Sequence, residues 1–216
     1  MPFQRINGKL VEASILPGQR VFSQRGAMLA YRGEVSFTPD LMGGQGGVLS
    51  MIGRRVANED TPLMTVEGHG TVLFGHGGHH VHVVDLVGDT LYVEADRLLA
   101  FDGTLRQSTM FMGAQGGVLG IVRGQVTGQG LFTTQLSGHG SAAMLAHGGV
   151  FELPITPDQP VHVDPQAYVG HRGEVRNRLS SALGWREFVG RGSGEAFQLE
   201  LSGHGVVYVQ ASEEKL

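Results

Sequence analysis

Apolar and polar residues alternate in short runs along most of the chain. Leu91–Glu94 (LYVE) and Phe197–Leu201 (FQLEL) both show a period of two. That period predicts β-strands with one buried and one polar face, paired in antiparallel fashion. Pairs such as Pro17-Gly18 separate the runs. They favour turns, because proline presets φ and glycine accepts unusual backbone angles. We therefore expect an all-β protein with little helix.

The same pattern returns along the chain at an offset of 70 positions. A first run recurs as Gly18–Ser23 (GQRVFS), Gly88–Val93 (GDTLYV) and Asp158–Val163 (DQPVHV). A second run follows each of these, as Leu29–Gly33 (LAYRG), Leu99–Gly103 (LAFDG) and Val169–Gly173 (VGHRG). A fixed period of this length indicates a repeated structural unit.

The remainder of the pattern also recurs. The glycine-rich run Gly43–Leu49 matches Gly113–Leu119, whereas the third copy has Ser181–Trp185 there and is five residues shorter. Each copy then reaches a Gly-His-Gly centred on His69, His139 or His204. We expect one compact domain, residues 1–216, of three repeats spanning 9–75, 79–145 and 150–210. The stretches 48–55, 118–122 and 183–189 could each hold a short helix or a loop.

Composition narrows the possible functions. The chain has 216 residues and no cysteine, which excludes disulfides, thiolate nucleophiles and cysteine-ligated metals and fits a reducing cytoplasm. It has neither a signal-peptide core in residues 1–16 nor an apolar run long enough to span a membrane. Its net charge of −4 makes nucleic acid an unlikely partner, because phosphate-backbone binding needs many Lys and Arg residues. We expect a cytoplasmic protein.

The repeated runs resemble the altered-inheritance-of-mitochondria family of bacterial and mitochondrial proteins. The resemblance rests on the strand ending in Leu-Ala-Tyr/Phe-x-Gly, the glycine-rich insert with Val-Leu, and Gly-x-Gly, and it extends from about Gly18 to Gln210. It implies the fold of the tryptophan RNA-binding attenuation protein, a double-stranded β-helix or compact β-sandwich, repeated within one chain. It implies no catalytic residue, and it suggests a scaffolding or membrane-organising role. The family often has proline where this chain has the histidine of Gly-His-Gly.

Histidines are the candidates for metal chemistry. His76, His80 and His82 lie in one glycine-rich cluster, and strand alternation places His80 and His82 on one face. If the three Gly-His-Gly histidines faced a common axis, they could bind zinc and leave its fourth position open. The alternative, which we favour for both sets, is structural: the cluster borders a turn, and glycines in a strand mark a bulge or a close backbone approach. We therefore assign no metal and no cofactor.

Other motifs add little. There is no Gly-x-Ser-x-Gly elbow and no phosphate loop, and the spacing of Gly190, Gly192 and Gly194 does not fit a dinucleotide site. A basic run could bind an acidic partner or form a solvated strand face, which we favour; it comprises His171, Arg172, Arg176, Arg178, Arg186 and Arg191.

We therefore predict a non-enzymatic scaffold protein that self-associates and presents loops to a protein partner. Exposed strand edges must be paired or covered, and homo-oligomers favour closed symmetry, so we expect a homo-oligomer and, by analogy, a trimer. The first alternative is a histidine-dependent metal-binding module or metalloenzyme. The second is an RNA-binding protein, on fold analogy alone.

Overall fold

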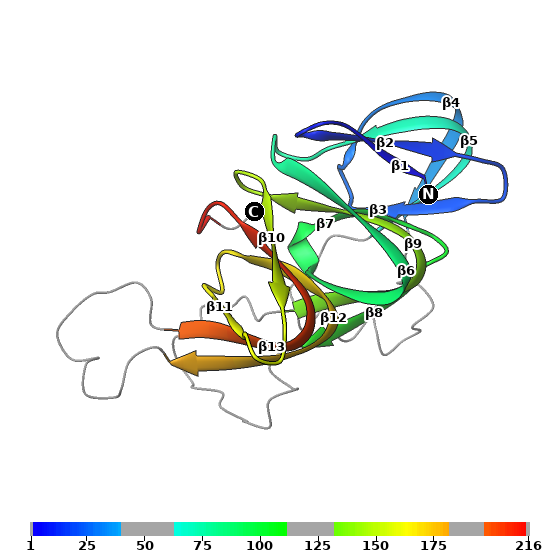
Figure 1. Ribbon diagram of the computed structural model, residues 1–216. Coiled ribbons are helices and arrows are strands. Elements are labelled where there is room, and N and C mark those ends of the chain that lie inside the picture. Colours follow the sequence, from blue (N-terminus) through cyan, green and yellow to red (C-terminus); the bar gives the residue numbers. More distant parts are fainter. Residues whose placement is uncertain (1, 40–62, 112–131, 182–196, 215–216) are drawn as a thin grey trace.

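The computed structural model describes residues 2–39, 63–111, 132–181 and 197–214, and their strands form a single sheet (Figure 1). All strand pairs are antiparallel; the strands are β1 (Phe3–Asn7), β2 (Leu10–Ile15), β3 (Arg20–Ser23), β4 (Met28–Pro39), β5 (Met64–Phe74), β6 (His80–Glu94), β7 (Leu98–Asp102), β8 (Arg106–Phe111), β9 (Phe132–Ala146), β10 (Val150–Ile155), β11 (Val161–Val163), β12 (Tyr168–Ser181) and β13 (Phe197–Gln210).

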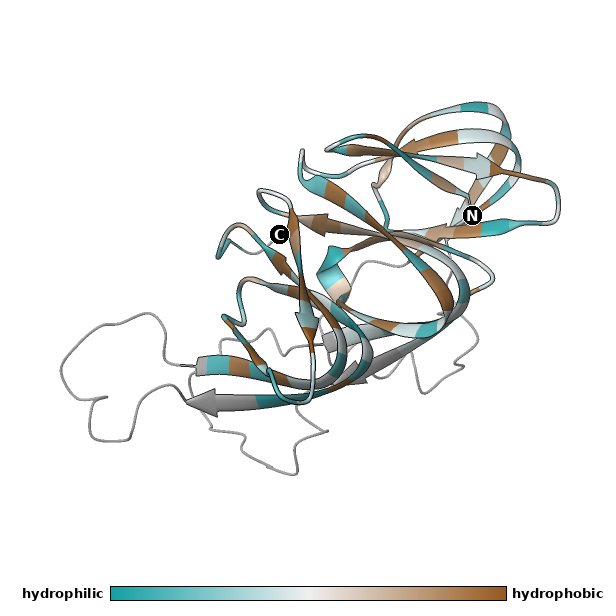
Figure 2. Ribbon diagram, viewed as in Figure 1, coloured by the Kyte–Doolittle hydropathy of each residue, from teal (hydrophilic) through white to brown (hydrophobic). Residues whose placement is uncertain are grey.

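The all-β prediction is confirmed over these residues. Their only helical element is a 3-10 turn, η2 (Ala95–Arg97). The three stretches for which a short helix or a loop was expected fall outside the described residues. Brown and teal segments alternate along several strands in Figure 2, as the period of two in the sequence predicts.

Three long strands organise the sheet: β5, β9 and β13. On one side β5 pairs with the long strand β4, β9 with the two short strands β7 and β8, and β13 with the long strand β12. On the other side β5 pairs with β2 and β3, β9 pairs with β6, and β13 pairs with β10 and β11. The registers follow the offsets of the sequence pattern, as in the pairs Val21↔Val66, Leu91↔Leu136 and Val161↔Leu201.

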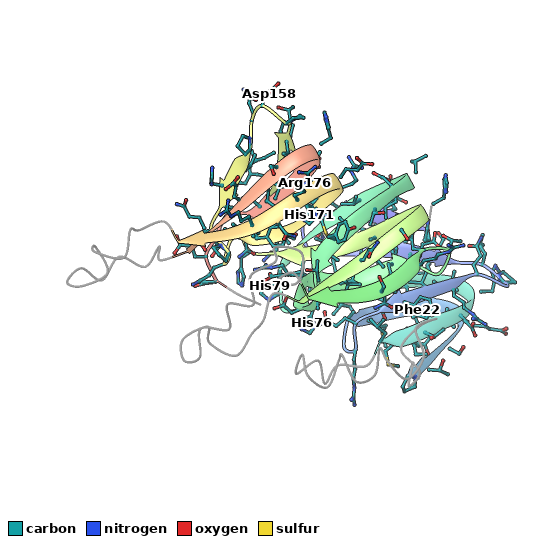
Figure 3. The ribbon with its side chains drawn as sticks, turned by 90° about the horizontal axis from the view of Figure 1, so that it is seen from below. Phe22, His76, His79, Asp158, His171 and Arg176 are labelled. Atoms are coloured by element: carbon teal, nitrogen blue, oxygen red, sulfur yellow. The ribbon has the colours of Figure 1, made fainter. Side chains whose placement is uncertain are left out.

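Two further pairings connect these groups of strands, and we call them joints. In the first joint β3 pairs with β7, with Phe22 opposite Phe101. In the second joint β6 pairs with β12, with Tyr92 opposite His171. Their labelled members Phe22 and His171 lie at separate places along the sheet (Figure 3).

The apolar core is divided into three clusters, and two of them bridge the groups of strands. The first contains Val11 and Phe74 from β2 and β5 together with Leu99 and Leu145 from β7 and β9. The second combines β6, β7 and β9 residues with Val169 and Tyr208 of β12 and β13, and the third lies within β10–β13. Burial of apolar area therefore stabilises both joints, at roughly 25 cal/mol per Å².

A buried ion pair lies beside the second joint. The fully buried Arg97 in η2 donates from Nε to Glu94 Oε2 at 2.7 Å. Its Nη1 donates to the side-chain oxygen of Gln210 and its Nη2 to the carbonyl of Gln166 at 3.3 Å. Because the partners come from β6 and from the segments around β12 and β13, this one guanidinium links residues far apart in sequence.

We predict that Arg97→Ala lowers the free energy of unfolding by about 3–5 kcal/mol, because it leaves the Glu94 carboxylate buried without its cation. Arg20→Ala is the matched control: its ion pair with Glu67 is exposed and should contribute only about 0–1 kcal/mol. Urea unfolding of the two variants measures the difference. Equal losses would contradict the interpretation.

Candidate functional site

The Gly-His-Gly motifs lie at matching places on β5, β9 and β13, and their glycines have a steric role. Gly68, Gly138 and Gly203 have φ of 130°, 123° and 125°, which residues with a side chain rarely adopt. A Cβ at Gly70 or at Gly205 would lie well under 3.0 Å from a backbone carbonyl of the paired strand. The glycines therefore permit close approach of the long strands.

The three histidines of these motifs project outward. His69, His139 and His204 are all exposed and lie on three different strands. Among the described residues no group of three or more His, Asp or Glu side chains is arranged to hold a metal ion. The fold thus does not bring the three histidines together within one chain.

We predict that Gly205→Ala destabilises the protein by about 1–3 kcal/mol, because the new methyl group would collide with the carbonyl of Arg172. The neighbouring His204→Ala removes only an exposed ring and should change the stability by less than about 0.5 kcal/mol. Thermal unfolding followed by circular dichroism compares the two. A larger loss for His204→Ala would assign the motif to its histidine instead.

Two histidines of the glycine-rich segment 76–82, His79 and His82, contact different partners. His82 Nε2 lies 3.3 Å from Glu152 Oε1 on β10, and burial lowers the pKa of His82 although Glu152 acts in the opposite direction. His79 packs edge-to-face on His147, with ring centroids 4.4 Å apart, and burial followed by His147 lowers its pKa. His147 Nδ1 in turn lies 3.7 Å from a carboxylate oxygen of Glu214. Among the described residues these contacts do not bring together three or more groups that could hold a metal ion.

His171 occupies an environment that the sequence did not reveal. The expectation of a solvated basic face is wrong at this position, since the residue is 2% exposed. Its ring stacks on Tyr92 with centroids 4.7 Å apart, and its Nδ1 shares a 2.6 Å hydrogen bond with the buried Tyr168 hydroxyl. Burial lowers the pKa of His171 to about 4 and raises that of Tyr168 well above its usual value. The second joint thus contains a neutral histidine.

The other arginines of the basic run differ among themselves. Arg172 lies 3.4 Å from Asp89 and also donates to the carbonyl of Asp85, whereas Arg176 and Arg178 are exposed. Arg186 and Arg191 lie outside the described residues. The run is therefore not one continuous cationic face over the described part of the chain.

We predict that the stability of the protein falls between about pH 6.5 and pH 4 because of His171. Its pKa is lower in the folded protein, so the unfolded chain takes up the proton first and acid favours unfolding; the loss amounts to about 3 kcal/mol. Urea unfolding at pH 7.5 and pH 4 measures it. The double variant His171→Phe/Tyr168→Phe should lose less on acidification, and an equal loss would contradict the assignment.

A half-open cavity of about 730 Å³ adjoins the second joint. Its charged lining is mixed in sign, with Asp89 and Glu174 beside Arg176. The cavity could admit a small polar molecule, but no fully buried polar side chain lines it. Its described lining therefore does not by itself indicate a ligand.

The fold defines an all-β protein built on a single antiparallel sheet. Residues 3–212 match the family described as mitochondrial biogenesis AIM24, and the chain belongs to that family. The resemblance found in the repeated runs is thereby confirmed.

Solved structures show a similar fold. A Streptococcus pyogenes protein, whose crystal structure comes from a structural genomics consortium, matches with a TM-score of 0.71 at 20% identity. The match covers 97% of this chain and 92% of that protein. No curated protein shows significant similarity. Among the described residues no helix is long and apolar enough to cross a membrane.

Proposed function

We propose that the protein is a non-enzymatic scaffold whose three repeats form equivalent units, stacked so that copies of the chain can add to both ends. The proposed units are residues 9–75, 79–145 and 150–210. A homo-oligomer, with a trimer as the expected size, would then present the segments that connect the long strands to a protein partner in the cytoplasm. The observation that carries this proposal is the exposure of apolar side chains on β4 and on β10, which would form the two ends of such a stack.

The first end is formed by β4. Leu29 is 55% exposed, whereas Leu99 and Val169, at the matching positions 70 and 140 residues later, are fully buried. Leu99 belongs to the apolar cluster at the first joint and Val169 to the cluster at the second. Burial of Leu29 therefore requires a neighbour that β4 does not have within the described chain.

The other end is formed by β10. Phe151 and Leu153 are 61% and 40% exposed. They pair with Val209 and Val207 of β13, as Val11 and Ala13 of β2 pair with Phe74 and Val72 of β5. Val11 and Ala13 are nevertheless completely buried, and they share the first cluster with Leu99.

The exposed residues at the two ends are complementary, because their buried counterparts pack against each other in the first cluster. In the first cluster, Leu99 belongs to the same core as Val11 and Ala13. At the two ends of the proposed stack, Leu29 on β4 is the counterpart of Leu99. Phe151 and Leu153 on β10 are the counterparts of Val11 and Ala13. A second copy could therefore bury both exposed sets by repeating the first joint.

The long strand pairs also support the presentation of loops. The strands flanking residues 40–62, 112–131 and 182–196 end on paired residues, such as Pro39↔Met64 and Ser181↔Phe197. The strand pairs β4–β5, β8–β9 and β12–β13 are thus paired up to or next to the last described residue on each side of these ranges. We propose that the partner binds there, because loops on a rigid scaffold carry binding function in many proteins.

We predict that the full-length protein forms a trimer at micromolar concentration, with three times the 23.0 kDa mass of the chain in light scattering. Leu29→Asp or Phe151→Asp should shift the mass to that of a single chain, because the oligomer would bury a carboxylate without a partner. Leu16→Asp, at an apolar residue that is 48% exposed but belongs to neither end, is the control and should keep the trimer. A monomeric wild-type protein would refute self-association.

A further inference from the structure

The two open strand edges of the chain match each other as the strands of the joints do. We propose that β11 of one chain pairs with β4 of a second copy, in the register that both joints already use. This inference rests on the self-association proposed above and specifies the strands that meet. Figure 1 shows β4 and β11 at opposite ends of the molecule, so this pairing has to occur between chains.

Each joint contains an aromatic pair directly across two strands. In the first joint the rings of Phe22 and Phe101 stack with centroids 5.1 Å apart and planes at 25°. In the second joint the rings of Tyr92 and His171 stack at 4.7 Å and 17°. Cross-strand stacking of this kind fixes both the register and the side on which the strands meet.

The sequence contains the residues of a third aromatic pair, but they lie on two strands, β4 and β11, that do not pair with each other within the described chain. Phe22 and Tyr92 are followed at the same offset of 70 by His162 in β11. Phe101 and His171 are preceded at that offset by Tyr31 in β4. His162 is exposed and Tyr31 is 52% exposed, whereas Phe101 and His171 are almost completely buried.

The backbone at the open edges fits the same arrangement. At the first joint the Gly103 N–H donates to the carbonyl of Arg20 at 2.9 Å, and a Cβ at Gly103 would lie 2.8 Å from the Cβ of Arg20. The matching residues at the open edges are Gly33 and Pro160. Gly33 is already required by the pairing of β4 with β5, because a Cβ there would lie well under 3.0 Å from the carbonyl oxygen of His69, and it leaves the open edge free of a side chain at this position. Pro160 keeps the carbonyl that the contact uses.

The resulting pairing is head-to-tail. Three residue pairs are expected across the two chains: Val161↔Arg32, His162↔Tyr31 and Val163↔Ala30. Each chain contributes a different edge to each contact, so the association is heterologous and closes into a ring when the rotation per chain divides a full turn. Within the described chain β4 has only β5 as a strand partner and β11 only β13, so the pairing would cover two otherwise open edges.

Introduced cysteines test this pairing directly, because the chain has none of its own. Full-length Tyr31→Cys and His162→Cys chains, each prepared alone and also co-expressed, are treated with a mild oxidant and separated on a non-reducing gel. We expect a disulfide-linked dimer of the co-expressed chains and none from either variant alone. The two Cα atoms of a directly opposed pair lie within disulfide reach, and both side chains point to the same face.

Two further variants serve as controls. Phe22→Cys/Phe101→Cys makes the same cross-link at the first joint, within one chain, and shows that this geometry permits a disulfide. Co-expressed His162→Cys and Arg32→Cys chains are shifted by one residue, so that the side chains point to opposite faces and no dimer should form.

The outcomes separate the two proposals. An oligomer in light scattering that gives no Tyr31–His162 cross-link, or that cross-links Tyr31→Cys chains to each other, overturns the head-to-tail register and leaves self-association standing. A protein that is monomeric in light scattering overturns both.

Discussion

Pairing of strand edges is the constraint on which the rest of this structure depends. A strand edge exposes backbone N–H and C=O groups, and each must find a partner strand or remain in water. The chain satisfies most of these edges by pairing strands within one third of the sequence, and two pairings join different thirds: β3 with β7 and β6 with β12. Two of the three apolar clusters, the stacked aromatic rings and the buried Arg97 lie at or beside these two joints.

The same constraint bears on the exposed apolar residues of β4 and β10. Leu29 and Tyr31 on β4 are exposed at positions that are buried at both joints, and Phe151 on β10 is exposed where Val11 on β2 is buried. Exposed apolar side chains are common singly, but here they occur where the repeated pattern places a joint. The proposed scaffold function rests on this match between the exposed apolar residues and the positions that are buried at the joints.

The histidines show how one residue type serves different purposes in one fold. In the Gly-His-Gly motifs the glycines determine the geometry, since a Cβ at Gly70 or Gly205 would collide with the partner strand, and the histidine between them is exposed. His171 is enclosed between Tyr92 and Tyr168, and burial keeps it neutral. Its matching residue at the first joint is Phe101, so the ring fills an aromatic position with an added hydrogen bond.

The sequence by itself determined the all-β class, the offsets of the pattern and the family, because alternation and glycine placement are local properties that survive in a string of letters. It also indicated the steric role of the Gly-His-Gly glycines. Only the tertiary structure decided which edges meet, that His171 is buried although it adjoins arginines, and that Glu94 and Arg97 pair away from solvent. The reason is physical: burial and edge pairing depend on strands more than 60 residues apart, as with Tyr92 and His171, and no local pattern encodes which of two similar edges a strand will find.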